Sequence, residues 1–150
     1  MIAGLPAHLV FPRGFRQEDG PITAARRRDL RGAVLHELAS DDFTDRTWTC
    51  VGLADAVILI DPAGGDGCLQ TARAARDLAR PLLATGGASR REPVARAAVA
   101  AWLEQTGARV LMVAGCRGSL LDSAGCRKLA AGQAAAVVCV AQERQQRLAT

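Results

Sequence analysis

The chain has 150 residues, of which 49% are hydrophobic and 23% charged, with 15 glycines. This length suits one domain with one hydrophobic core, and the composition is that of a folded rather than a disordered protein. No apolar run reaches the roughly 18 residues that span a bilayer, and the first eleven residues lack the features of a signal peptide. We therefore expect a single domain over residues 1–150, located in the cytoplasm, with no membrane partner.

The net charge is +4, and arginine supplies nearly all of the basic residues because Lys128 is the only lysine. The planar guanidinium of arginine binds phosphates and carboxylates through paired hydrogen bonds. The basic residues are spread along the chain, which favours an anionic small molecule over nucleic acid as the partner. The five cysteines are an odd number without a CxxC pair, so neither a disulfide framework nor a zinc site is indicated.

Hydrophobic patterning predicts the first elements in chain order. The short apolar run Ala7–Phe11 is typical of a strand, and the charged loop Pro12–Ile22 follows it. Arginines beside leucines and valines over residues 24–38 predict a short amphipathic helix. The continuous apolar run Leu53–Ile60 is the strongest strand candidate, since Asp61-Pro62 follows it at once.

The second half of the chain alternates in the same way. A glycine-rich turn over Ala63–Gly67 leads into a helix over Cys68–Ala79, and Pro81–Thr85 is a short strand. Glu92-Pro93 opens a helix that continues to about Thr106, and Arg109–Ala114 is another apolar strand. The tail Cys126–Arg147 has strong helix propensity, although Ala134–Val140 could instead be a last strand.

Uniformly apolar strands that alternate with helices predict an α/β fold, in which a mostly parallel sheet is covered on both faces. We expect a Rossmann-like three-layer α/β/α domain with its core over about residues 7–119 and a helical tail over about 120–150. Ligands of such folds bind at the carboxyl ends of the strands. The polar loops after Phe11, Ile60 and Ala114 all belong to that edge.

The segment Asp61–Thr71 leaves a strand and enters a helix. Its glycines, Gly64, Gly65 and Gly67, permit close backbone approach, and the following helix amides suit a phosphate. The segment matches neither the Walker pattern nor GxGxxG, so a plain strand-to-helix turn is an equal alternative. Cys68 opens the helix, where the dipole lowers a thiol pKa, but an inert cysteine is the commoner outcome.

Two other loops carry candidate anion contacts. Arg13 and Arg16 face the acids Glu18 and Asp19 along the chain, so they could clamp an anion or pair with those acids on the surface. Arg46 and Thr47 precede a strand, and Arg117 and Ser119 follow one. Each of the four could donate to a phosphate or be an ordinary surface residue.

The stretch PRGFRQEDGPI resembles the P-[KR]-G-x-R-x-E-D-G-x-I motif of the putative molybdenum carrier family, the circularly permuted YpsA-like branch of the SLOG superfamily. Further pieces follow in the family's order between Val10 and Ser119. They are Arg46-Thr47 with Val51, Asp55-Ala56, Gly64-Gly65, Ala101-Trp102-Leu103, and Val110-Leu111 with Val113-Ala114-Gly115, Arg117 and Ser119.

The resemblance implies a Rossmann-like fold related to the lysine-decarboxylase-like phosphoribohydrolases and to DNA-processing protein A. In those relatives a glycine-rich turn at a helix start holds a nucleotide or phosphoribose group. Gly67-Cys68-Leu69 with Thr71-Ala72-Arg73 is also similar to the GSLxTAR segment of DNA-processing protein A, without indicating a DNA function.

The chain departs from the family at several positions. Family members begin with a strand and a GGQTGVD turn, so relative to them this chain is truncated at its N-terminus, and a sheet lacking that strand invites self-association or covering by the tail. Trp48 and Cys50 replace the family's Glu and Asn, and Asp66 replaces a Thr. The catalytic Glu of the phosphoribohydrolases corresponds to Gln70 or Thr71, which argues against hydrolysis by that route.

We therefore expect a carrier-type protein that binds an anionic small ligand, a nucleotide or a molybdopterin-type cofactor, rather than a catalyst. Arg13 and Arg16 would contact the anion, the glycine-rich turn would hold its phosphate, and Arg117 would close the site. The alternatives are a nucleotide-processing enzyme and a degenerate paralogue that acts as an interaction module. The candidate binding residues are Arg13, Gly14, Arg16, Glu18, Asp19, Arg46, Thr47, Gly64, Gly65, Asp66, Gly67, Cys68, Gly115, Arg117 and Ser119.

Overall fold

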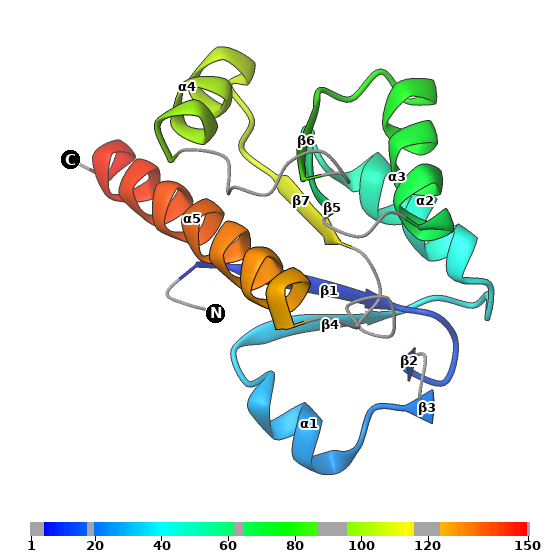
Figure 1. Cartoon of the computed structure of the whole chain (residues 1–150). Helices are drawn as coiled ribbons and strands as arrows, with labels where there is room; N and C mark the ends of the chain where they lie inside the picture. Colours follow the sequence, from blue (N-terminus) through cyan, green and yellow to red (C-terminus); the bar gives the residue numbers. More distant parts are fainter. Residues whose placement is uncertain (1–4, 18–19, 62–64, 87–95, 116–123, 150) are drawn as a thin grey trace. The chain divides into compact units, whose positions relative to one another are not determined.

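A computed structural model of the chain describes residues 5–17, 20–61, 65–86, 96–115 and 124–149. The chain divides into two compact units, Met1–Cys50 and Val51–Thr150. Each unit carries parallel strands together with helices, so the expected α/β class is confirmed (Figure 1). The single domain over residues 1–150 stays a prediction.

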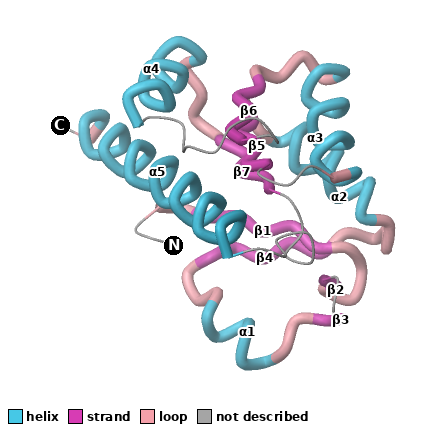
Figure 2. Tube along the Cα trace, in the orientation of Figure 1, coloured by secondary structure: helices cyan, strands magenta, loops and turns pink. Residues whose placement is uncertain are grey.

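The first unit is built on two parallel strands, β1 (Ala7–Phe11) and β4 (Ala33–Glu37), which lie side by side in Figure 2. β1 has the bounds expected from its apolar run. Within the loop that follows β1, two short strands pair antiparallel. The remaining elements that begin in this unit are β2 (Arg16–Gln17), β3 (Gly20–Pro21), α1 (Ala24–Asp29) and α2 (Phe43–Leu53).

The helix expected over residues 24–38 is wrong beyond Asp29. Thr23 begins α1 by accepting a hydrogen bond from the Arg26 amide at 3.1 Å. Gly32 then adopts a φ of +90°, which ends helical geometry, and the chain continues as β4. The spacing of Val34 and Leu35 fitted a helix, but these residues pair with β1 instead, because ladder hydrogen bonds override a weak local pattern.

The expected strand start at Leu53 is also wrong, because the undetected helix α2 continues to that residue. The Asp42 carboxylate accepts from the Thr44 amide at 2.7 Å, as a helix-capping side chain does. Strand β5 then covers Ala56–Asp61. The Asp42 cap before an amphipathic run was therefore the sequence signal for α2.

The second unit contains a three-stranded parallel sheet in the order β6-β5-β7. Its register aligns Ile60 of β5 with Thr85 of β6 and Gly115 of β7, so all three strands end at one edge. Helix α3 begins beyond this edge of the central strand. The elements that accompany β5 are α3 (Asp66–Asp77), β6 (Leu82–Gly86), α4 (Arg96–Thr106), β7 (Leu111–Gly115) and α5 (Ala124–Leu148).

Helices cover both faces of this sheet, with α3 on one side and α4 and α5 on the other (Figure 1). Ile58 and Ile60 pack with Val99 and Leu103 of α4 and with Val137 and Val140 of α5. The alternative strand over Ala134–Val140 is wrong, because Val137 and Val140 lie three apart on one helical face. The segment expected as a tail therefore supplies part of the core.

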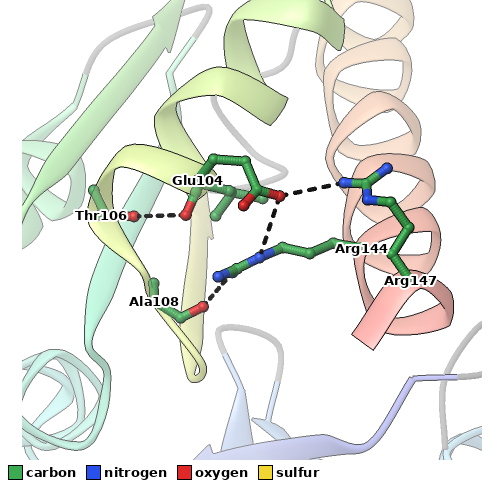
Figure 3. Close-up of polar contacts among 6 residues, drawn as sticks. Glu104, Thr106, Ala108, Arg144 and Arg147 are labelled. Atoms are coloured by element: carbon green, nitrogen blue, oxygen red, sulfur yellow. Dashed lines mark hydrogen bonds and ion pairs between the residues drawn. The ribbon is translucent and has the colours of Figure 1, made fainter. Parts of the chain in front are cut away.

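Polar contacts join α5 to the end of α4, as Figure 3 shows. Arg144 donates to the Ala108 carbonyl, and its Nε lies 3.7 Å from Glu104 Oε1. Arg147 Nη2 lies 3.3 Å from the same carboxylate oxygen. Arg144 is only 17% exposed, so its guanidinium is a largely buried cross-link between the two helices. Within the described ranges, no helix is long and apolar enough to cross a membrane.

Candidate functional site

The start of α3 is the best-defined candidate for binding an anion. Gly65 precedes the helix and has no side chain that could cap it. The Gly65 carbonyl accepts from the amides of Cys68 and Leu69, each at 3.0 Å. Among the described residues, the amides of Asp66 and Gly67 donate to no backbone carbonyl, so they keep the partial positive charge of a helix N-terminus.

The two side-chain positions at this helix start have opposite effects on an incoming anion. A Cβ built on Gly67 would meet no atom within 4 Å, so internal packing does not require glycine there. Its absence leaves the backbone open to a ligand. Asp66 is exposed in the first turn, where its carboxylate stabilises the helix dipole and repels a second negative charge.

The side chains in the next positions of α3 face the protein interior. Cys68 is 2% exposed, which makes its thiol inaccessible to a ligand, and its amide is already bonded to Gly65. The Thr71 hydroxyl donates to the Gly67 carbonyl at 2.9 Å. Gln70 is exposed. By resemblance, the catalytic Glu of the phosphoribohydrolases corresponds to Gln70 or Thr71. Gln70 has a neutral amide, and the Thr71 hydroxyl is hydrogen-bonded within the helix.

Gly115 ends β7 at the same edge, and strand packing explains why glycine stands at this position. A Cβ at this position would lie 3.2 Å from the Ile60 carbonyl oxygen, tighter than nine in ten real contacts of this kind. A larger residue would require the paired backbones of β7 and β5 to shift by a few tenths of an ångström. Gly115 is therefore explained by strand packing.

A buried polar pair at the edge was missed by the sequence reasoning. Thr85 is 1% exposed and its Oγ1 lies 2.8 Å from Gln133 Oε1, while Gln133 is 2% exposed. Gln133 Nε2 is buried and bonded to nothing in the described part of the chain. Nothing in the alanine-rich sequence around Gln133 marks it as an inward-facing position, so only the packing of α5 reveals it.

The PRGFRQEDGPI loop lies in the first unit, and contacts to β4 and to the segment after β4 hold the start of the loop in place. Gly14, at a φ of +78°, donates its amide to Glu37 Oε1 at 2.6 Å. Arg13 pairs with Asp41 at 3.3 Å, with both side chains more than half exposed. Arg16 begins β2 and is exposed. The acid that Arg13 meets is thus Asp41, which sequence spacing did not suggest.

Arg46 and Thr47 make contacts along their own helix, α2. The Thr47 hydroxyl donates to the Phe43 carbonyl at 3.1 Å, and the Arg46 guanidinium lies 5.3 Å from the centre of the Phe43 ring. Burial raises the pKa of the Cys50 thiol, and the nearby Arg46 charge acts against that rise. These contacts account for both residues without a ligand.

Five of the expected site residues lie outside the described residues, namely Glu18, Asp19, Gly64, Arg117 and Ser119. Of the rest, the structure brings Gly65, Asp66, Gly67, Cys68 and Gly115 together at one sheet edge of the second unit. Arg13, Gly14, Arg16, Arg46 and Thr47 belong to the first unit. Within the ranges described, no group of three or more His, Cys, Asp or Glu side chains could hold a metal ion.

Comparisons with known proteins agree with this architecture. The model of the family described as circularly permutated YpsA SLOG matches residues 2–143. No match is found among curated proteins. The chain is similar in structure to a putative molybdenum carrier protein from Syntrophus aciditrophicus, with 18% sequence identity and a TM-score of 0.64. The alignment covers 90% of this chain and 76% of that one, which shows that the two share a fold.

Proposed function

The chain belongs to the circularly permutated YpsA family of SLOG proteins, and from this premise we propose that it binds an anionic small ligand at the start of α3. The ligand class is a nucleotide or a molybdopterin-type cofactor, both of which combine a phosphate ester with a flat nitrogen heterocycle. A structural relative carries the name of a molybdenum carrier. The proposed role is therefore binding and carrying rather than catalysis.

The proposal rests on the N-terminus of α3, which no side chain caps. Asp66 and Gly67 offer two amides beyond the carboxyl end of the central strand, and Gly67 leaves room for an atom to approach them. Glycine costs up to about 1 kcal/mol relative to alanine in a helix, and no packing contact at Gly67 offsets that cost. Gly52 and Gly132 are equally open but lie beyond the first turns of their helices, so only Gly67 combines an open backbone with first-turn amides that suit an anion.

Thermal unfolding in the presence of AMP, GMP, pyrophosphate and molybdate tests the proposal. A ligand present at 100 times its Kd adds about 2.7 kcal/mol to the free energy of unfolding. We expect at least one phosphate-bearing probe to raise the melting temperature in a concentration-dependent manner. If none of the four probes does so, the proposal is wrong.

Gly67→Ala tests the location of the site. We expect this variant to be about 0.5–1 kcal/mol more stable without ligand, since alanine favours the helix, and to bind the active probe at least about tenfold more weakly. Gly132→Ala in α5 is the matched control, because its Cβ would also meet nothing within 4 Å. The control should gain similar stability and keep its affinity. Equal affinities for both variants would place the site elsewhere.

A further inference from the structure

The only two histidines of the chain meet on the first unit's sheet, far from each other in sequence. His8 lies on β1 and His36 on β4, and both side chains are exposed. His8 Nδ1 and His36 Nε2 face each other at 2.9 Å. The parallel ladder fixes this pair, since it places Val34 opposite His8 and Val10 opposite His36.

The two rings lie edge to edge in nearly one plane. Their planes differ by 13°, and their centres are 5.2 Å apart. This separation exceeds the 2.9 Å between the facing nitrogens by about two ring radii, so both nitrogens lie on the line that joins the centres. In the metal-free pair one nitrogen donates its proton to the other.

We propose that His8 and His36 form a two-histidine site for a divalent transition-metal cation of the Cu²⁺ or Ni²⁺ class. Imidazole nitrogen is a preferred ligand of these ions. Two nitrogens at right angles around a metal, with bonds of about 2.0–2.1 Å, lie about 2.8–3.0 Å apart, so the facing nitrogens, 2.9 Å apart in their hydrogen bond, are within reach of one ion.

Since the facing nitrogens now point straight at each other, each ring must turn by about 45° before both lone pairs meet at one ion, and both side chains are exposed enough to turn. The proton between the rings moves, through water, to the other nitrogen of the ring that carried it. Both facing nitrogens then hold lone pairs, and the neutral pair releases no net proton. Water completes the tetragonal coordination, so the two strands supply only the cis pair of ligands.

Titration of the untagged, full-length chain with Cu²⁺ and, separately, with Ni²⁺ at pH 8 tests the proposal. We expect one equivalent to bind with Cu²⁺ tighter than Ni²⁺, and the electron paramagnetic resonance spectrum of the copper form to show two imidazole nitrogens. Ni²⁺ is included because it does not oxidise the chain's thiols. His8→Gln and His36→Gln should each weaken binding of either ion by at least about tenfold.

Glu37→Gln is the matched control, because Glu37 is the carboxylate next to His36 on β4 and its amide replacement can still accept from Gly14. It should bind both ions as the wild type does. Two results would overturn the proposal: wild-type affinity in either histidine variant, or a copper spectrum with fewer than two imidazole nitrogens. Circular dichroism of each variant must match the wild type, since both histidines are exposed and neither is needed for the fold.

Discussion

The buried pair Thr85–Gln133 leads to an asymmetric prediction about stability. The Thr85 hydroxyl has one proton and two acceptors within reach, Gln133 Oε1 at 2.8 Å and the Leu59 carbonyl at 3.4 Å. The Gln133 amide has two N–H groups, and Thr85 can accept from at most one of them if the amide is turned over. In either orientation at least one buried N–H of Gln133 remains unpaired within the described residues.

The hydrogen bonds of Thr85 and Gln133 set the loss of stability expected for each variant. Thr85→Val removes the contact that satisfies Gln133 and leaves the whole amide buried without a partner, which costs about 1–3 kcal/mol. Gln133→Met removes the unpaired amide, while Thr85 can still donate to Leu59, so this variant should change stability by less than about 1 kcal/mol. The double variant should be close to Gln133→Met, because both polar partners are gone.

Equilibrium urea unfolding measures the three free energies, with the fluorescence of Trp102, which packs against this core, as one reporter. Thr47→Val is the control, since its hydroxyl bonds within its own helix and its loss leaves no side-chain partner unpaired. If Gln133→Met costs more than Thr85→Val, or if the double variant costs as much as Thr85→Val alone, the reasoning about the unpaired amide is wrong.

Three further predictions concern the second unit. Leu103→Ala should cost about 2–5 kcal/mol in urea unfolding because Leu103 is 2% exposed in the core, whereas Leu69→Ala, at a position 68% exposed, should stay within about 0.5 kcal/mol. Arg144→Met should cost about 1–3 kcal/mol by leaving the Ala108 carbonyl unpaired, while Arg147→Met should cost at most about 1 kcal/mol and lose its effect in high salt. Hydrogen bonds from the Val110 and Arg109 amides hold the pKa of Asp55 below its usual 3.8, so Asp55→Ala should be less stable than wild type at neutral pH. That difference should close as the pH falls through the lowered pKa, and a constant difference in acid would contradict it.

Hydrophobic patterning predicted correctly those elements in which the apolar residues follow one regular pattern from start to end. The strand Ala7–Phe11 and the helix that contains Ala74 and Ala75 follow directly from apolar runs and helical spacing. Residues 33–37 were predicted wrongly because Leu30, Val34, Leu35 and Leu38 have helical spacing. Pairing with β1, a contact between segments distant in sequence, makes them a strand instead. The helix over 43–53 was not predicted because its many polar residues weaken the apolar pattern, although Asp42 marks its start.

The sequence predicted only those parts of the candidate site whose functional groups are neighbours in the sequence. A glycine-rich turn before a helix indicates open amides without any knowledge of the fold, and the structure places Asp66 and Gly67 in that position. By contrast, the meeting of His8 with His36, of Thr85 with Gln133, and of Arg13 with Asp41 depends on separations of 28 to 48 residues. No spacing rule along one sequence encodes such contacts.

The glycines of the candidate site differ in the physical reason for which glycine stands at each position. Gly14 adopts a left-handed conformation that other residues avoid, and Gly115 has the Ile60 carbonyl where a side chain would be. The fold therefore explains both. Gly67 has neither constraint, and in a helix it lowers stability relative to alanine. Gly52 and Gly132 also meet no atom within 4 Å but lie beyond the first turns of their helices, so the case for anion binding rests on the combination at Gly67 of an open backbone with the first-turn amides of α3.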